Sequence, residues 1–130
     1  MKTLKLLLFC TYLLSANLSF AQTNESEAYL STIESEDLRQ LLYVYASDYF
    51  QGRKTGELGQ KRAVNFLKEF YQNRGIKAAE GTEDYYQKMN LNIKGKKVAT
   101  ENVVAIIKGS EKPEEYLVIS SHLDHIGIHD

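Results

Sequence analysis

The sequence predicts an α/β fold, with a mixed central sheet flanked by helices. Two observations carry this prediction: the earlier part of the 130 residues contains two segments with the apolar spacing of helices, and the later part contains three segments with the pattern of strands. A chain of this length forms one domain at most.

The predicted helices cover residues 36–47 and 58–74. The first has acidic residues in its first turn, where the helix dipole favours them, and follows a polar segment, 22–35, that we expect to be flexible and to end in a short helix. Its expected core-facing stripe is Leu38, Leu41, Leu42 and Tyr45. The second helix has a broad apolar face and is ended by Gly75. Between the helices, the three glycines of residues 48–59 indicate a tight connection with positive φ angles.

Three predicted strands follow the helices. Residues 85–94 alternate between two faces, as in a half-buried strand, whereas 102–108 and 116–121 are apolar and β-branched, as in buried strands. The connection between the last two strands is too short for a crossover helix, so we expect them to pair as an antiparallel hairpin.

The first 21 residues have the features of a secretory signal peptide. Lys2 and Lys5 precede an apolar stretch, and Ala21 ends this stretch at a small-residue cleavage site. The stretch is shorter than the ~20 apolar residues that span a membrane. A lipid-modified cysteine is disfavoured because the bulky Phe9 precedes Cys10. We therefore expect a secreted or periplasmic protein with no membrane contact beyond the cleaved signal peptide.

The composition of the mature chain limits its partners and its metal ligands. Cys10 is the only cysteine and leaves with the signal peptide, so we expect no disulfide, and histidine and carboxylate groups must bind any metal. Lysine and arginine are dispersed rather than gathered on one stripe, which indicates that the chain does not bind nucleic acid.

All three histidines lie in the last nine residues, directly after the 116–121 run. Alternate side chains of an extended segment point the same way, so His122 and Asp124 should share one face. An imidazole and a carboxylate at this spacing suit a metal site, because the histidine binds the ion and the carboxylate either binds too or orients the ring. Two groups are fewer than the three or four that hold zinc, so a solvated tail and a metal-free His–Asp hydrogen bond stay open as alternatives.

Residues 121–127, Ser-His-Leu-Asp-His-Ile-Gly, resemble a string in the co-catalytic di-zinc aminopeptidases. This family includes secreted bacterial leucyl aminopeptidases, glutamate carboxypeptidase and glutaminyl cyclase. The Gly-Arg-Lys-Thr-Gly loop at 52–56 leading into the helix before Gly75, and the Asn-Val-Val-Ala strand at 102–105, are also similar to the family. The string resembles the metallo-β-lactamase fold as well, but that family has a further histidine where this chain has Ser120.

The resemblance to the aminopeptidases implies a zinc-peptidase-like three-layer α/β/α fold over residues 36–130, truncated after the third strand. It implies that His122 is a zinc ligand and that Asp124 is the catalytic-site carboxylate that orients His122 and tunes the metal. The family enzymes use two zinc ions to polarise a carbonyl at a peptide N-terminus and to lower the pKa of a bridging water. The bridging aspartate, the glutamate base and the other ligands lie further along in the family, so we expect this chain to be an N-terminal portion that is inactive alone.

The sequence leaves some residues without a role and two other functions open. The resemblance assigns nothing to His125, His129 or Arg53. A small exported binding module, with its tyrosines as contact surface, is the alternative from a different class, although core packing already explains most of those tyrosines. A metallo-β-lactamase-like hydrolase is disfavoured by Ser120 and by helices where that fold begins with strands.

Overall fold

The computed structural model describes residues 27–128 of the chain. The predicted signal peptide, 1–21, and the last two residues lie outside the described part. The chain divides into two units, Met1–Leu42 and Tyr43–Asp130, and each is described by itself. Within the described part, no helix is both long enough and apolar enough to cross a membrane.

Helix α3 (Ser35–Tyr45) confirms the first predicted helix. None of its residues is buried, and Leu38 and Leu42 are 58% and 64% exposed. The prediction that these two leucines face the core is therefore wrong. Apolar spacing shows which side chains share a face of a helix, but burial requires another element to cover that face. The rest of the first unit's described part consists only of a helical turn at 27–30 and its connection to α3.

The core of the second unit forms where the short helix η1 (Asp48–Arg53) packs against α4 (Leu58–Asn73). Phe50 of η1 and Ala63 and Val64 of α4 are each at most 2% exposed. Three further aromatic rings surround Phe50, with centroids 5.2 to 5.6 Å from its own: Tyr45, Tyr49 and Phe66. Such aromatic clusters contribute large buried areas and favourable edge-to-face contacts, so this cluster holds η1 on the helix.

Helix α4 confirms the second predicted helix, and Gly75 follows it with a φ of +68°. The predicted positive φ angles in the connection are confirmed for Gly52 and Gly56, at +62° and +78°. The prediction is wrong for Gly59, which lies in the first turn of α4. Glycine is required there by close packing instead, because a Cβ on Gly59 would lie 2.0 Å from the carbonyl oxygen of Phe50.

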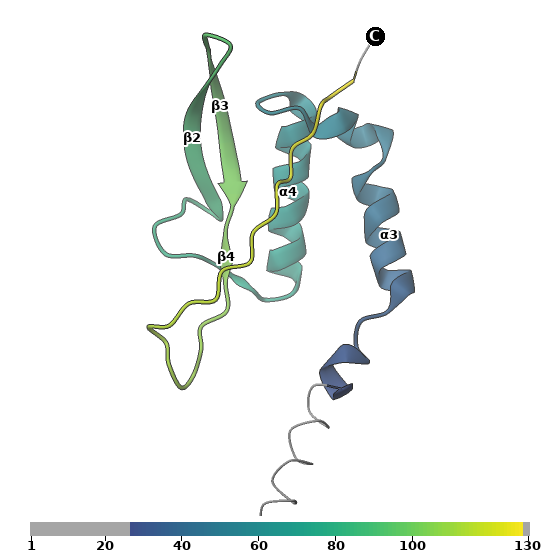
Figure 1. Ribbon diagram of the computed structural model, residues 1–130, viewed down its shortest axis with the longest axis vertical. Coiled ribbons are helices and arrows are strands. Elements are labelled where there is room, and N and C mark those ends of the chain that lie inside the picture. The colour runs from purple at the N-terminus through teal and green to yellow at the C-terminus, as the bar shows by residue number, and fades with distance from the viewer. Residues whose placement is uncertain (1–26, 129–130) are drawn as a thin grey trace, which may run out of the picture. The chain divides into compact units, whose positions relative to one another are not determined.

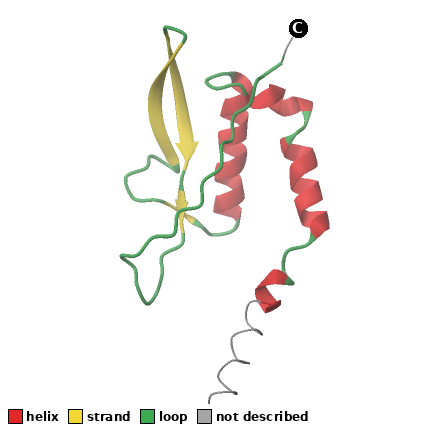
Figure 2. Ribbon diagram, in the orientation of Figure 1, coloured by secondary structure: helices red, strands yellow, loops and turns green. Residues whose placement is uncertain are grey.

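Two small antiparallel sheets form the strand part of the second unit (Figure 2). Strand β2 (Tyr86–Ile93) pairs with β3 (Lys96–Val103), so that the first residue of β2 lies opposite the last residue of β3. The turn at 94–95 has positive φ at both positions, as in the type I′ turns that suit hairpin twist. Strand β1 (Lys77–Ala78) pairs with β4 (Ala105–Ile106). Figure 1 shows the β2–β3 hairpin alongside α4.

Polar side chains link the hairpin to α4. Lys61 Nζ lies 2.6 Å from the carboxylate of Glu101, and Gln60 Nε2 donates to the Glu101 carbonyl at 3.5 Å. Gln60 is 1% exposed and Thr100 of β3 is 7% exposed, so the contact between helix and hairpin is close.

The last two predicted strands do not form as expected. Of residues 102–108, the first two end β3 and residues 105–106 form β4, because the N–H of Val104 donates to the carbonyl of Tyr85 at 2.8 Å and the pairing partner changes there. Residues 116–121 have no regular secondary structure. Leu117, Val118 and Ile119 of that run are 81% to 90% exposed. The predicted hairpin between these two segments is therefore wrong.

The described residues confirm the coarse α/β class, with helices and antiparallel strands. Their strands form two pairs, β1–β4 and β2–β3, rather than one central sheet. A β-branched apolar run such as 116–121 becomes a buried strand only where neighbouring strands and covering helices surround it. Within residues 27–128 no element takes those positions.

Candidate functional site

Two segments that the sequence singled out lie side by side in the second unit (Figure 1). We call residues 51–56 the glycine loop and residues 122–127 the C-terminal segment. The N–H of Gly127 donates to the carbonyl of Gly52 at 2.9 Å, and the N–H of His125 donates to the carbonyl of Arg53 at 3.0 Å. Lys54 and His125 form a short parallel bridge. Backbone hydrogen bonds therefore dock the C-terminal segment on the glycine loop.

An unusual backbone turn makes this docking possible. Three consecutive residues, Gln51, Gly52 and Arg53, have positive φ angles of +47°, +62° and +50°. For the two residues that are not glycine, this conformation costs about 1 kcal/mol or more each. Gly52 has a second requirement, because a Cβ there would lie 2.3 Å from the carbonyl oxygen of Gly127. The hydrogen bonds that the carbonyls of this turn accept from the C-terminal segment thus offset part of its strain.

Arg53 links three parts of the site through its side chain. Its Nε donates to the carbonyl of Leu123 at 2.9 Å, and its Nη1 donates to the carbonyl of Tyr45 at 2.7 Å. The guanidinium lies 4.5 Å from the centre of the Tyr45 ring, and the Tyr45 hydroxyl donates to the same Leu123 carbonyl at 3.3 Å. Burial raises the pKa of the Tyr45 hydroxyl above its usual range; the Arg53 charge opposes this shift, and the charge of Asp124 adds to it.

His122 and Asp124 lie close together, as the alternation of an extended segment predicts. Nδ1 of His122 is 2.8 Å from the backbone carbonyl oxygen of Asp124 and 3.6 Å from its Oδ1. A carbonyl oxygen can only accept, so Nδ1 carries the proton and the lone pair of the neutral ring is on Nε2. The hydroxyl of Thr55 donates to the other carboxylate oxygen, Oδ2, at 2.5 Å. The glycine loop therefore fixes the carboxylate, and the carbonyl of Asp124 orients the ring.

The donor set is correct in kind for zinc and short in number. Nε2 of His122 is one donor, whereas zinc sites hold three or four ligands; the carboxylate of Asp124 lies on the Nδ1 side of the ring, where it can orient the ring. No group of three or more metal-binding side chains occurs among residues 27–128. His125 contributes its backbone N–H to the docking, and its side chain is exposed. His129 lies outside the described residues.

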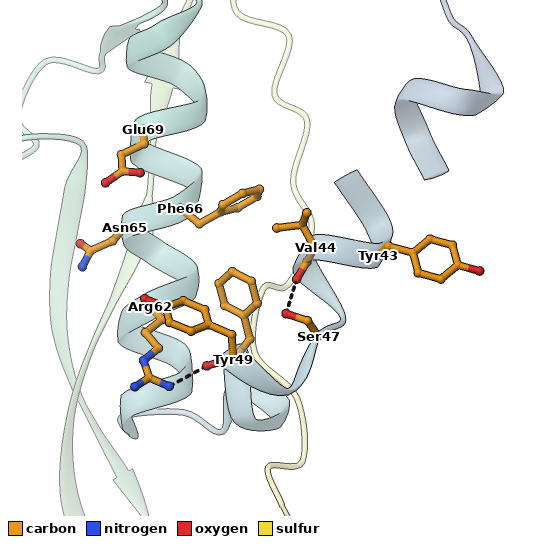
Figure 3. Close-up of a pocket in the computed structure, with 9 residues that line it drawn as sticks. Tyr43, Val44, Ser47, Tyr49, Arg62, Asn65, Phe66 and Glu69 are labelled. Carbon is orange, nitrogen blue, oxygen red and sulfur yellow. Dashed lines mark hydrogen bonds between the residues drawn. The ribbon is translucent and has the colours of Figure 1, made fainter. Parts of the chain in front are cut away.

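A separate groove of about 600 Å³ lies between residues 43–50 and α4 (Figure 3). Aromatic rings, including Phe50 and Phe66, form much of its wall. Arg62 stacks on Tyr49 at 4.5 Å and donates to the Tyr49 carbonyl at 2.7 Å. None of its lining residues belongs to the glycine loop or to the C-terminal segment, so this groove and the His–Asp chemistry are in different places.

Three residues of the site were not recognised from the sequence. Arg53 had no assigned role, Tyr45 was expected only as a core residue, and Thr55 was quoted only within the resemblance. The available signal was the Gly-Arg-Lys-Thr-Gly string itself, since two of these three side chains belong to it. Comparison of the chain with protein-family models, with curated proteins and with solved structures gave no match. The chemistry of His122 and Asp124, and of the side chains that hold them, is what indicates a function.

Proposed function

We propose that this chain is the N-terminal portion of a secreted or periplasmic zinc-dependent metallopeptidase that hydrolyses peptide bonds at peptide N-termini. His122 is a metal ligand in this proposal, and Asp124 is the residue that orients it. The observation that carries the proposal is the ordered pair itself: Thr55 holds the carboxylate of Asp124, and the carbonyl of Asp124 leaves Nε2 of His122 free to bind an ion. The resemblance of residues 121–127 to the di-zinc aminopeptidases supplies the reaction and the substrate class.

The geometry around His122 favours a role as metal ligand over the alternative of a solvated tail. Most metal-binding histidines donate their second ring N–H to a carbonyl or a carboxylate, which fixes the tautomer and the ring orientation. Nδ1 of His122 has such a partner at 2.8 Å, although the side chain is 81% exposed. The carboxylate of Asp124 places a negative charge beside the ring, which favours a bound cation.

The proposed fold is the three-layer α/β/α arrangement, in which 116–121 is a central strand. Support comes from the composition of this run, which is uncharged and β-branched, and from its exposure in the described residues. When bound, zinc polarises a carbonyl and lowers the pKa of a bound water. One ligand does not complete a zinc site, so the proposed peptidase activity requires further ligands and a general base besides His122 and Asp124.

The proposal is tested by titrating the isotope-labelled chain with zinc and following the histidine ring signals by NMR, which detects weak binding. We expect the His122 signals to shift with one zinc ion. His122→Ala should abolish the binding, whereas His125→Ala is the matched control and should preserve it. Asp124→Asn keeps the backbone carbonyl and removes the charge, and it should weaken zinc binding by about 10-fold or more, as changes to such supporting groups do. Unchanged zinc binding in His122→Ala would contradict the proposal.

A small exported binding module is the second candidate function, and the groove beside α4 is the observation that favours it. The groove is large enough for a side chain or a small ligand, and its walls are aromatic. However, the guanidinium of Arg62 on its rim is already bonded to Tyr49. The zinc titration separates the two functions, because a binding module at the groove gives no role to His122.

A further inference from the structure

We propose that Arg53 and Tyr45 form a lock that positions His122 and Asp124 before any metal binds. The use of the positioned pair for zinc rests on the function proposed above, whereas the positioning itself is a property of the metal-free chain. Arg53 and Tyr45 are positioning residues in this proposal, because neither touches a ligand of the metal directly; they act through the backbone of Leu123.

The carbonyl of Leu123 is the point at which the lock acts. Nε of Arg53 donates to it at 2.9 Å and the hydroxyl of Tyr45 donates to it at 3.3 Å, so both lone pairs of one oxygen have a partner. This carbonyl belongs to the peptide plane that joins Leu123 to Asp124. Because the peptide bond is planar, two donors on its oxygen also fix the N–H and the Cα of Asp124.

Arg53 is itself held in place. Its Nη1 donates to the carbonyl of Tyr45, the last residue of α3, where backbone carbonyls have no partner within the helix and attract positive charge. Its guanidinium stacks 4.5 Å from the centre of the Tyr45 ring. A planar guanidinium can make these contacts together, and a lysine ammonium cannot. The side chain therefore has little freedom left when it meets Leu123.

The carbonyl of Asp124 lies in the next peptide plane, which joins Asp124 to His125. The lock fixes the Cα of Asp124 at one end of this plane, and the N–H of His125 at its other end donates to the carbonyl of Arg53 at 3.0 Å. The ring of His122 depends on this fixed backbone. Its side chain is 81% exposed, so packing does not orient it. Its hydrogen bond among the described residues is the one from Nδ1 to the carbonyl of Asp124 at 2.8 Å, with the Asp124 carboxylate 3.6 Å away. The position of the Asp124 carbonyl therefore decides which ring nitrogen carries the proton. The tautomer of His122 is consequently a direct reporter of the lock.

The chain contains a matched control for the lock. Arg62 also stacks 4.5 Å from the centre of a tyrosine ring, that of Tyr49, and its Nη1 also donates to that tyrosine's carbonyl at 2.7 Å. The Arg62–Tyr49 pair thus repeats the contacts between Arg53 and Tyr45, at the same distances, without a bond to the C-terminal segment. Loss of the Arg62 side chain removes the same kinds of interaction from the second unit but does not change the hydrogen bonds to the Leu123 carbonyl.

The test measures the imidazole nitrogen shifts of the ¹⁵N-labelled, metal-free chain at alkaline pH. We expect His122 to show mainly the Nδ1–H tautomer, with the exposed His125 as the reference in the same spectrum. Arg53→Met should move the His122 shifts toward those of His125, and Arg62→Met should leave them unchanged. Unchanged His122 shifts in Arg53→Met, or an equal change in Arg62→Met, would overturn the proposal.

A second pair of variants keeps the test decisive if Arg53→Met does not fold. Tyr45→Phe removes the hydroxyl bond to Leu123 and keeps the ring under Arg53, whereas Tyr49→Phe is its control. We expect a smaller tautomer shift in Tyr45→Phe and none in Tyr49→Phe, and no shift in Tyr45→Phe would overturn the proposal. Zinc titration of the same samples separates this proposal from the proposed metallopeptidase function. A tautomer shift in the variants without zinc binding to the chain supports the lock and contradicts the zinc role. Zinc binding to the chain without a tautomer shift in the variants supports the zinc role and contradicts the lock.

Discussion

The contact between Gly52 and Gly127 predicts that Gly52→Ala separates the glycine loop from the C-terminal segment. A Cβ on Gly52 would lie 2.3 Å from the carbonyl oxygen and 2.8 Å from the Cα of Gly127, and a backbone cannot rotate away as a side chain can. The alanine would also have a φ of +62°, which costs about 1–2 kcal/mol. Separation breaks the two backbone hydrogen bonds between the segments, each of which contributes about 1 kcal/mol, so the free energy of unfolding should fall by about 3–4 kcal/mol.

Gly75→Ala is the matched control for this change. Gly75 has a similar φ of +68°, but a Cβ there meets no atom within 4 Å. This variant should therefore lose only the conformational part, about 1–2 kcal/mol. Urea denaturation measures both free energies, and hydrogen exchange should show lost protection at the amides of His125 and Gly127 in Gly52→Ala alone. Equal destabilisation by the two variants, or retained protection at both amides, would refute the proposed docking.

Two further predictions concern pH and solubility. Burial raises the pKa of the Tyr45 hydroxyl in the folded chain, so the unfolded chain loses the hydroxyl proton first as the pH rises. The contribution of Tyr45 to the free energy of unfolding is therefore complete below about pH 10 and is lost above it. Urea midpoints between pH 8 and 11 should show this decline, Tyr45→Phe should reduce it, and an unchanged decline in that variant would contradict the assignment. Val118→Lys should reduce self-association in light scattering without lowering the melting temperature, because Val118 is 81% exposed within an uncharged apolar run. A clear fall in melting temperature would show that Val118 is packed in solution.

Much of the local structure was predictable from the sequence. The apolar spacing of 58–74 and its terminal Gly75 predicted α4, and the alternation of 85–94 predicted β2. Each of these patterns reflects interactions between residues a few positions apart, so a single stretch of sequence contains the information. The spacing of His122 and Asp124 belongs to the same class, since alternation alone brings the two residues together.

Burial and pairing were predicted less well. The leucine stripe of α3 has the correct spacing and is exposed, and the run 116–121 has the composition of a strand without a strand beside it. The β-forming stretch 102–108 is shared between two sheets because its partners, β2 and β1, come from different parts of the chain. Composition indicates that a segment can be buried, whereas burial itself depends on what the rest of the chain places against it.

The sequence by itself predicted the helices, strand β2 and the proximity of His122 to Asp124. Only the tertiary structure decided that Arg53 and Thr55 hold this pair, because these contacts join residues about 70 positions apart. The physical reason is that a strained left-handed turn such as that at Arg53 is unfavourable alone and is stabilised by a distant partner. The sequence alone indicated residues 122 and 124 as site residues, whereas only the folded structure showed that the glycine loop orients them.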